Sequence, residues 1–310
     1  YTTLFRSGRL NIAATATGAF SGVLINGAET HRFTGTLTSM PPGLLANGVV
    51  TILRPHQPSL TLTFAMEAAT EDLLSSNLSD GTNAEPITAW RADWSALSPP
   101  TEYMGYYTLG FEDESGQPAH PRGKGFASLA ISSAGNYTLS GRLADGIAFS
   151  TAAVVGPQGQ VLVHQSSATQ DTILGVLSIT PGLGPPFNNN ALAGTPTWSR
   201  KPQAAKQRLY QSGFTSIALT ATGGSYAGST GIVMDLPDEP ANAQLVFTGG
   251  GLDSASPDIT LQIKPGGGVL LPAVNPQKTS LKVLPTTGAI SGSFSWNSRA
   301  TSYQGLLVKH

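Results

Sequence analysis

The chain has 310 residues, of which 40% are hydrophobic and 11% charged, with a formal net charge of −1 and no cysteine. A charged fraction well below the roughly 25% of ordinary soluble domains, without any basic stripe, argues against a nucleic-acid binder. The patterned apolar content argues against disorder, and no apolar run approaches the ~20 residues of a membrane helix.

The absence of cysteine excludes disulfides, thiol nucleophiles and Cys-ligated zinc. Together with the polar, weakly charged surface, it favours a secreted or cell-surface bacterial protein. The first residues have neither a basic n-region nor an apolar h-region. We therefore expect that a signal peptide has been removed or lies outside this sequence.

The first predicted element is a meander that begins at Leu10 and continues to Leu37. Alternate residues are apolar, as in Leu10 and Ile12, and Gly18 lies where a tight turn needs positive φ. Similar strand–turn–strand patterns surround Gly135 and Gly288. Further strands are expected at 60–64, 87–94, 103–111, 172–179, 214–222 and 259–263. One short helix is expected at 65–74, and hairpin turns at Asp80-Gly81 and Asp145-Gly146.

Two proline-containing passages, 98–100 and 200–202, divide the chain into three pseudo-repeats at about 1–97, 101–202 and 207–310. The connections are too short for flexible linkers, so a single module of residues 1–310 is expected. The predicted fold is all-β: roughly 18 strands in antiparallel meanders that form a closed or nearly closed barrel. The first and last repeats would lie side by side and close it. A pair of β-sandwiches is the alternative.

Several stretches resemble a module of very large secreted proteins of environmental Gram-negative bacteria, where it often lies beside immunoglobulin-like domains. The similar residues include 18–24, 32–35, 87–92, 105–109, 125–131, 139–149, 197–200, 287–294 and 303–307. They are turn and core positions rather than chemical groups. The resemblance implies a surface protein and brings no catalytic residue. The acidic segment 112–124 departs from the pattern.

No catalytic motif is present. The histidines are isolated in sequence and are interpreted as solvated loop or strand residues: His31, His56, His120, His164 and His310. Gly223-Gly-Ser225-Tyr-Ala227 fails the nucleophile-elbow pattern and is interpreted as a turn. No metal site, cofactor or catalytic residue is expected.

Carboxylates are the other candidates for chemistry. A glycosidase needs two that face each other, and Asp93, Asp145, Asp171 and Asp235 are instead expected at strand ends or turns. Glu112, Asp113 and Glu114, and the group of Asp235, Asp238 and Glu239, lack the spacing of an EF-hand loop. Residues 249–251 and 266–268 are glycine turns rather than phosphate cradles.

Four tryptophans leave two interpretations open: Trp90, Trp94, Trp198 and Trp296. An exposed indole would stack on a sugar, whereas Trp94 and Trp198 lie at matching points of two repeats, as core residues would. The core interpretation is favoured.

The leading functional hypothesis is a non-enzymatic structural or adhesive module, a filament or stalk subunit, whose partners are other surface proteins or copies of itself. A glycan-binding module is the second hypothesis. A polysaccharide-active enzyme with a spatially assembled carboxylate pair is the third.

Overall fold

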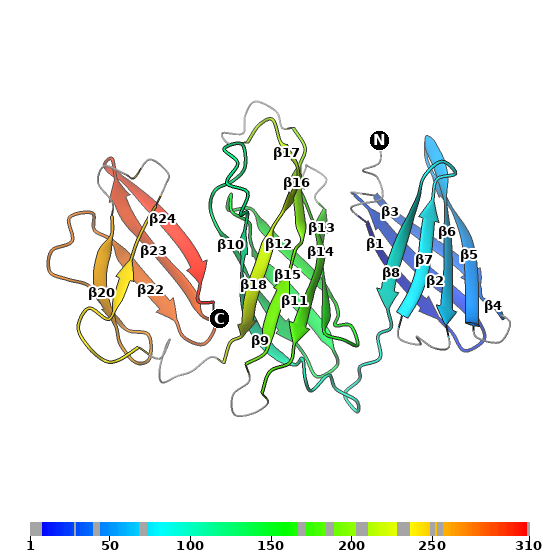
Figure 1. The fold of residues 1–310 in the computed structure, drawn as a ribbon, viewed down its shortest axis with the longest axis horizontal. Helices are drawn as coiled ribbons and strands as arrows, with labels where there is room; N and C mark the ends of the chain where they lie inside the picture. Colours follow the sequence, from blue (N-terminus) through cyan, green and yellow to red (C-terminus); the bar gives the residue numbers. More distant parts are fainter. Residues whose placement is uncertain are drawn as a thin grey trace.

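The computed structural model describes residues 8–27, 29–39, 44–67, 73–166, 171–183, 189–202, 210–227, 236–248, 252 and 257–308. These residues form 24 strands and no helix. They therefore contain no helix that is long and apolar enough to cross a membrane. The strands pair antiparallel, which confirms the all-β prediction. Figure 1 shows three groups of strands in a row, here called the first, middle and last bodies.

The first body (residues 8–90) is a pair of packed sheets. One sheet contains β1 (Gly8–Ala14), β2 (Ala19–Asn26) and β3 (Glu29–Thr36). The other contains β4 (Thr38–Ser39), β5 (Leu44–Arg54), β6 (Gln57–Glu67), β7 (Leu73–Ser79) and β8 (Ala84–Trp90). Apolar side chains from both sheets form one core, with Phe20 and Phe33 from the small sheet and Leu60, Leu62 and Phe64 from the large one.

The middle body (residues 105–225) is one ten-stranded sheet. Its strands are β9 (Gly105–Glu112), β10 (Gly125–Ile131), β11 (Asn136–Arg142), β12 (Ala148–Val154), β13 (Gln160–Ser166), β14 (Asp171–Thr180), β15 (Ala191–Gly194), β16 (Thr197–Arg200), β17 (Phe214–Ala218) and β18 (Thr220–Ser225). The order is β12-β11-β10-β9-β18-β15-β14-β16-β17, with β13 on β14. The sheet curls around a core that includes Tyr107, Tyr137 and Trp198.

The last body (residues 243–306) contains two three-stranded sheets that share a core. The strands are β19 (Ala243–Leu245), β20 (Ile259–Ile263), β21 (Val269–Leu270), β22 (Ser280–Leu284), β23 (Ala289–Trp296) and β24 (Arg299–Leu306). Ile259, Leu261 and Ile263 of β20 pack with Val283 of β22. This arrangement and that of the first body agree with the packed-sheet alternative.

The prediction of a closed or nearly closed barrel over the whole chain is wrong. The first and last bodies do not lie side by side, because the middle body separates them (Figure 1). The middle sheet curls into a half-barrel without closing, since no backbone ladder between described residues joins β12 to β13. Instead, the side-chain oxygen of Gln165 accepts the Ser150 N–H at 2.5 Å. Three separate cores form because each group of strands buries its own apolar face.

Three local predictions also change. The expected helix at 65–74 is wrong at its described residues, because β6 continues to Glu67 and β7 begins at Leu73. Cross-strand pairing of Met66 with Leu74 outweighs the helix propensity of this segment. The strand expected at 87–94 ends at Trp90. The strand expected at 214–222 is interrupted at Leu219, where the chain changes from pairing with β16 to pairing with β15 and β9.

The glycine turns have a common geometry. Five hairpin turns span five residues each and share two backbone hydrogen bonds. The N–H of the first residue donates to the carbonyl of the fifth. The fourth residue is a glycine with positive φ, and its N–H donates to the carbonyl of the first. The glycines are Gly18, Gly135, Gly146, Gly159 and Gly267. This is a type I turn followed by a left-handed residue, which matches the right-handed twist of the flanking strands. The predicted turns at Asp80-Gly81 and Asp145-Gly146 are both found, with φ of +90° and +86° at the glycines.

Candidate functional site

The densest group of titratable side chains in the middle body lies in the loop between β9 and β10. Asp113 follows β9 directly, and its Oδ1 accepts the Ser115 N–H at 2.9 Å. Gly116 has φ of +64°, which allows the chain to reverse there. The Gln117 N–H then donates to Ser115 Oγ at 3.4 Å. Short Asp, Ser and Gly residues therefore build this compact loop by local hydrogen bonds.

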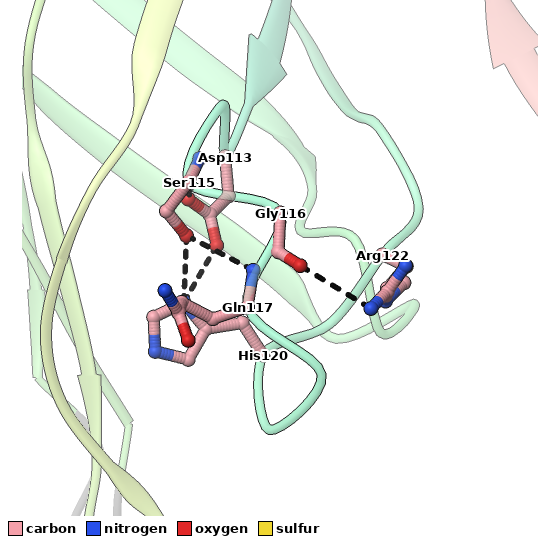
Figure 2. Close-up of polar contacts among 6 residues, drawn as sticks. All are labelled: Asp113, Ser115, Gly116, Gln117, His120 and Arg122. Atoms are coloured by element: carbon pink, nitrogen blue, oxygen red, sulfur yellow. Dashed lines mark hydrogen bonds and ion pairs between the residues drawn. The ribbon is translucent and has the colours of Figure 1, made fainter.

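His120 closes the loop. Its Nδ1 lies 2.7 Å from Asp113 Oδ2 and 3.2 Å from Ser115 Oγ, as Figure 2 shows. The His120 N–H donates to the Gln117 carbonyl at 3.0 Å. Arg122 donates to the Gly116 carbonyl at 3.2 Å on the other side of the loop (Figure 2). Most side-chain hydrogen bonds here therefore serve the loop itself.

The carboxyl of Asp113 is held ionised. Burial raises its pKa, but hydrogen bonds from Ser115 and His120 favour the charged form and outweigh that effect, so the pKa lies below the usual 3.8. Only 8% of the Asp113 side chain is exposed, against 23% for His120. The aspartate is thus a structural acceptor rather than an available base.

The arrangement does not match a Ser-His-Asp hydrolase. In such a triad the serine faces one imidazole nitrogen and the aspartate the other. Here Ser115 and Asp113 both face Nδ1 of His120. One ring nitrogen cannot take the serine proton and also donate its own N–H to the aspartate. The geometry supports loop stabilisation instead.

An aromatic and charged layer lies next to this loop. The His120 ring is 6.2 Å from the Phe214 ring, and Phe214 meets Trp198 edge to face at 4.8 Å. The Arg200 guanidinium carbon lies 5.7 Å and 5.5 Å from the Trp198 and Phe214 ring centres. Such cation–π contacts and edge-to-face pairs stabilise a packed end of the sheet.

Arg200 also forms a buried ion pair with Asp145. Their side chains are 5% and 4% exposed. Asp145 lies in the β11–β12 turn and also accepts the Ile147 N–H at 3.0 Å. A carboxylate that is buried, paired and hydrogen-bonded in this way is already occupied, so it is a poor candidate for catalysis.

The other carboxylates considered for a glycosidase lie elsewhere. Asp93 is exposed and pairs with Arg91 at 3.1 Å. Asp171 begins β14, where its backbone is in register with Arg200. Asp235 lies outside the described residues.

The acidic residues at the end of β9 and just after it do not converge on one point. Glu112 pairs with Lys124 at 2.7 Å, Asp113 pairs with His120, and Glu114 is exposed. Asp238 accepts a hydrogen bond from Gln262 at 2.8 Å, and Glu239 is exposed. Within the described ranges, no three His, Asp or Glu side chains are placed to hold a metal.

The remaining histidines are dispersed. Nε2 of His31 lies 3.2 Å from Glu29, and His56 occupies the exposed β5–β6 turn with φ of +58°. His164 is buried in β13, and His310 lies outside the described residues. Gly223-Gly-Ser225 lies in β18 rather than in a turn, and residues 266–268 form the β20–β21 turn. Residues 249–251 lie outside the described part.

None of the four tryptophans is exposed. Trp198 is 1% exposed, in the core as expected, and the other three are half-buried. Trp90 donates to the Val154 carbonyl at 3.1 Å, and Trp94 donates to the Val155 carbonyl at 2.8 Å. These contacts place Trp90, at the end of β8, and Trp94, in the segment after it, against the middle body rather than on an open surface.

A shallow, open groove of about 730 Å³ lies where the first and middle bodies meet. It is bordered by Arg9 of β1 and by residues of β10, β11 and β12, among them Ile131, Asn136 and Ala152. Arg9 crosses this border, because its Nη1 donates to the Ala152 carbonyl at 2.7 Å. The groove is thus part of the junction between two bodies.

Comparison with family models, curated proteins and solved structures finds no match to this chain. The resemblance to a module of secreted bacterial proteins therefore stays a prediction.

Sequence reasoning did not single out Arg9 and Arg200, two residues with important contacts. Their bonds join segments 143 and 55 residues apart, and no spacing rule relates such positions. The one available signal was the low charge content: where charged residues are few, each is more often placed for a specific contact.

Proposed function

We propose that this chain is a non-enzymatic structural module of the outer surface of a bacterium, which holds β bodies in line and serves a stalk or filament. Its partners would be other surface proteins or further copies of itself. The observation that carries the proposal is that side chains bridge neighbouring bodies at both junctions.

At the first junction, one strand from each sheet of the first body contacts β12. Arg9 of β1 donates to Ala152, and Trp90 at the end of β8 donates to Val154. The connecting segment 91–104 is then fastened along the middle body by Trp94, which donates to Val155, and by Tyr103. Bridging hydrogen bonds from a structured connection limit relative motion in a way that a free linker cannot.

At the second junction, two tyrosines reach the β22–β23 turn. Tyr106 of β9 donates to the Thr287 carbonyl at 3.1 Å, and Tyr226 donates to the Pro285 carbonyl at 2.7 Å. The two rings pack edge to face at 6.2 Å. Backbone acceptors make these contacts independent of the side chains in the turn.

The exposed area supports an extended molecule. A compact monomer of 32 kDa exposes about 12,000 Å². This chain exposes 17347 Å². Three small cores in a row leave more surface in water than one core would, and that suits a spacer better than an enzyme with a deep cleft.

Small-angle X-ray scattering of the full chain tests the architecture. We expect an elongated particle, and we expect the double variant Arg9→Met, Trp90→Phe to broaden the distance distribution because the bridges of the first junction are lost. Arg91→Met is the matched control, since the ion pair that Arg91 forms among the described residues is with Asp93, within the same connecting segment. A compact wild-type particle, or equal profiles for all variants, would contradict the proposal.

Immunogold labelling of intact source cells tests the location. Label on the outer surface is expected, and label confined to the cell interior would reject this part of the proposal. Glycan binding and polysaccharide cleavage are less well supported, because the tryptophans are not exposed and Asp145 is already paired.

A further inference from the structure

Four hairpin glycines share one more contact. Gly18, Gly135, Gly159 and Gly288 have φ between +71° and +84°, and each carbonyl accepts the N–H of a residue at or just after the end of the second strand that follows the turn. The donors are Leu37, Val155, Ile179 and Leu307, at 2.7 to 2.9 Å. We call the glycine together with its donor residue a turn socket. Because glycine has no side chain, it leaves a flat surface beside its own backbone carbonyl.

Three turn sockets are covered by an aromatic ring. A Cβ placed on Gly135 would lie 2.5 Å from Trp94, one on Gly159 2.8 Å from Tyr103, and one on Gly288 3.1 Å from Tyr226. A Cβ on Gly135 or Gly159 would force a shift of the ring, whereas one on Gly288 would require the ring to move by a few tenths of an ångström.

Each of these rings also donates a hydrogen bond to a carbonyl of the turn socket or its turn. Trp94 donates to Val155, Tyr103 to Pro157 at 3.4 Å, and Tyr226 to Pro285. The covering residue is thus an aromatic with a polar hydrogen, Trp or Tyr, in every case. This chemistry suits a ring whose face is apolar and whose tip is polar.

The covering residue comes from the segment that leads into the body. Segment 91–104 enters the middle body, which contains Gly135 and Gly159. Tyr226 directly follows β18, at the start of the segment that enters the last body, which contains Gly288. The ring therefore fastens a body to what precedes it.

The turn socket of the first body differs. Among the described residues, the atoms nearest to a Cβ on Gly18 are the carbonyl oxygen and Cβ of Leu37, at 3.7 and 3.8 Å. Gly18 is half-exposed, whereas Gly135, Gly159 and Gly288 are buried. The sequence Thr17-Gly18-Ala19 is the same as Thr287-Gly288-Ala289.

The geometry points to the Gly18–Leu37 turn socket as a docking site for a Trp- or Tyr-bearing connecting segment of another β body. The ring would cover Gly18 and donate to a carbonyl of the turn or of Leu37. This inference rests on the proposed structural role and adds the surface through which a preceding body attaches.

Asparagine substitutions test whether the site is open. Asn tolerates a left-handed φ, so Gly→Asn mainly adds a side chain. Gly146→Asn is the matched control, because Gly146 has φ of +86° in the same turn type and no atom within 4 Å. We expect Gly18→Asn to lower Tm no more than Gly146→Asn does, and Gly135→Asn to lower it clearly more. A loss at Gly18 equal to that at Gly135 would show a filled site and overturn the inference.

Binding is tested with a peptide of residues 91–104 added to the full ¹⁵N-labelled chain. We expect saturable shifts of the Gly18 and Leu37 amide signals, at least fivefold weaker binding when Trp94 and Tyr103 of the peptide are replaced by Ala, and loss of binding in Gly18→Asn but not in Gly146→Asn. No shift at about 5 mM peptide, or equal shifts without the aromatic residues, would overturn the inference.

If the peptide binds only after residues 1–7 are removed, the site belongs to the chain's own N-terminal segment. This result too would overturn the inference. The scattering experiment on the peptide-free chain decides the proposed structural role separately. The two can therefore fail independently.

Discussion

At the scale of single residues, the Asp145–Arg200 pair is the most buried ion pair among the described residues. Two charges taken out of water are tolerated only when they satisfy each other. Arg200 meets this condition with the carboxylate on one side and the Trp198 and Phe214 rings on the other. The pair fixes the β11–β12 turn against β16.

Removal of one charge should destabilise the middle body strongly. We expect Asp145→Asn or Arg200→Met to lower its free energy of unfolding by about 3–5 kcal/mol, because the remaining charge stays buried and unpaired. Urea unfolding followed by tryptophan fluorescence measures this. The double variant should recover most of the loss. A double variant as unstable as the sum of both single variants would show that the ion pair is not the relevant interaction.

At the scale of elements, glycines inside strands pair with rings across the sheet. Gly22 is in register with Phe33, Gly35 with Phe20, and Gly48 with Phe64. In each pair the ring lies where a Cβ would be, 2.2 to 2.4 Å from its position. Glycine weakens a strand, but a ring that covers it restores the packing.

Gly48→Ala should therefore destabilise the first body by about 1–3 kcal/mol, since the new methyl group displaces the Phe64 ring. Gly110→Ala in β9 is the control, because the nearest atom to its Cβ would be 3.9 Å away. That change should be neutral or stabilising by about 0.4–1 kcal/mol through the unfolded state. Thermal unfolding of both variants measures the contrast, and equal effects would refute the ring-cover argument.

At the scale of the whole molecule, we expect the bodies to differ in their response to alkaline pH. Burial raises the pKa of Tyr107, although a hydrogen bond from Asn190 partly opposes it, and burial also raises the pKa of Tyr137. Both belong to the middle core, whereas residues 8–90 contain no tyrosine. A neutral phenol is favoured in the folded state, so this stability is complete below the unfolded pKa near 10 and is lost as pH rises above it.

We expect the middle body to lose stability between pH 10 and 12 before the first body does. Urea unfolding at a series of pH values measures this order, with tyrosinate absorbance as the signal for the middle body. Hydrogen exchange of the two bodies at the same pH values is the second measurement. Tyr137→Phe should reduce the loss in the middle body. Simultaneous loss of both bodies, unchanged in Tyr137→Phe, would contradict the assignment.

Much of the local structure could be predicted from the sequence. Period-two apolar positions such as Leu129 and Ile131 show which face of a strand is buried, and glycines such as Gly135 mark tight turns. The same patterns could not separate a short strand from a helix at 65–74, because Ala, Met and Glu favour a helix until a partner strand pairs with them. For the candidate site, the sequence indicated Asp113 and His120 separately, but it did not predict that they contact each other.

By itself, the sequence determined the all-β class, the turn positions and the lack of cysteine chemistry, because periodicity and glycine conformation act within a few residues. Only the tertiary structure decided that three cores form in place of one barrel, that Arg9 and Trp90 bridge two bodies, and that Trp94, Tyr103 and Tyr226 cover turn glycines. These are contacts between distant segments, whose energies depend on which faces meet, and one sequence does not record that choice.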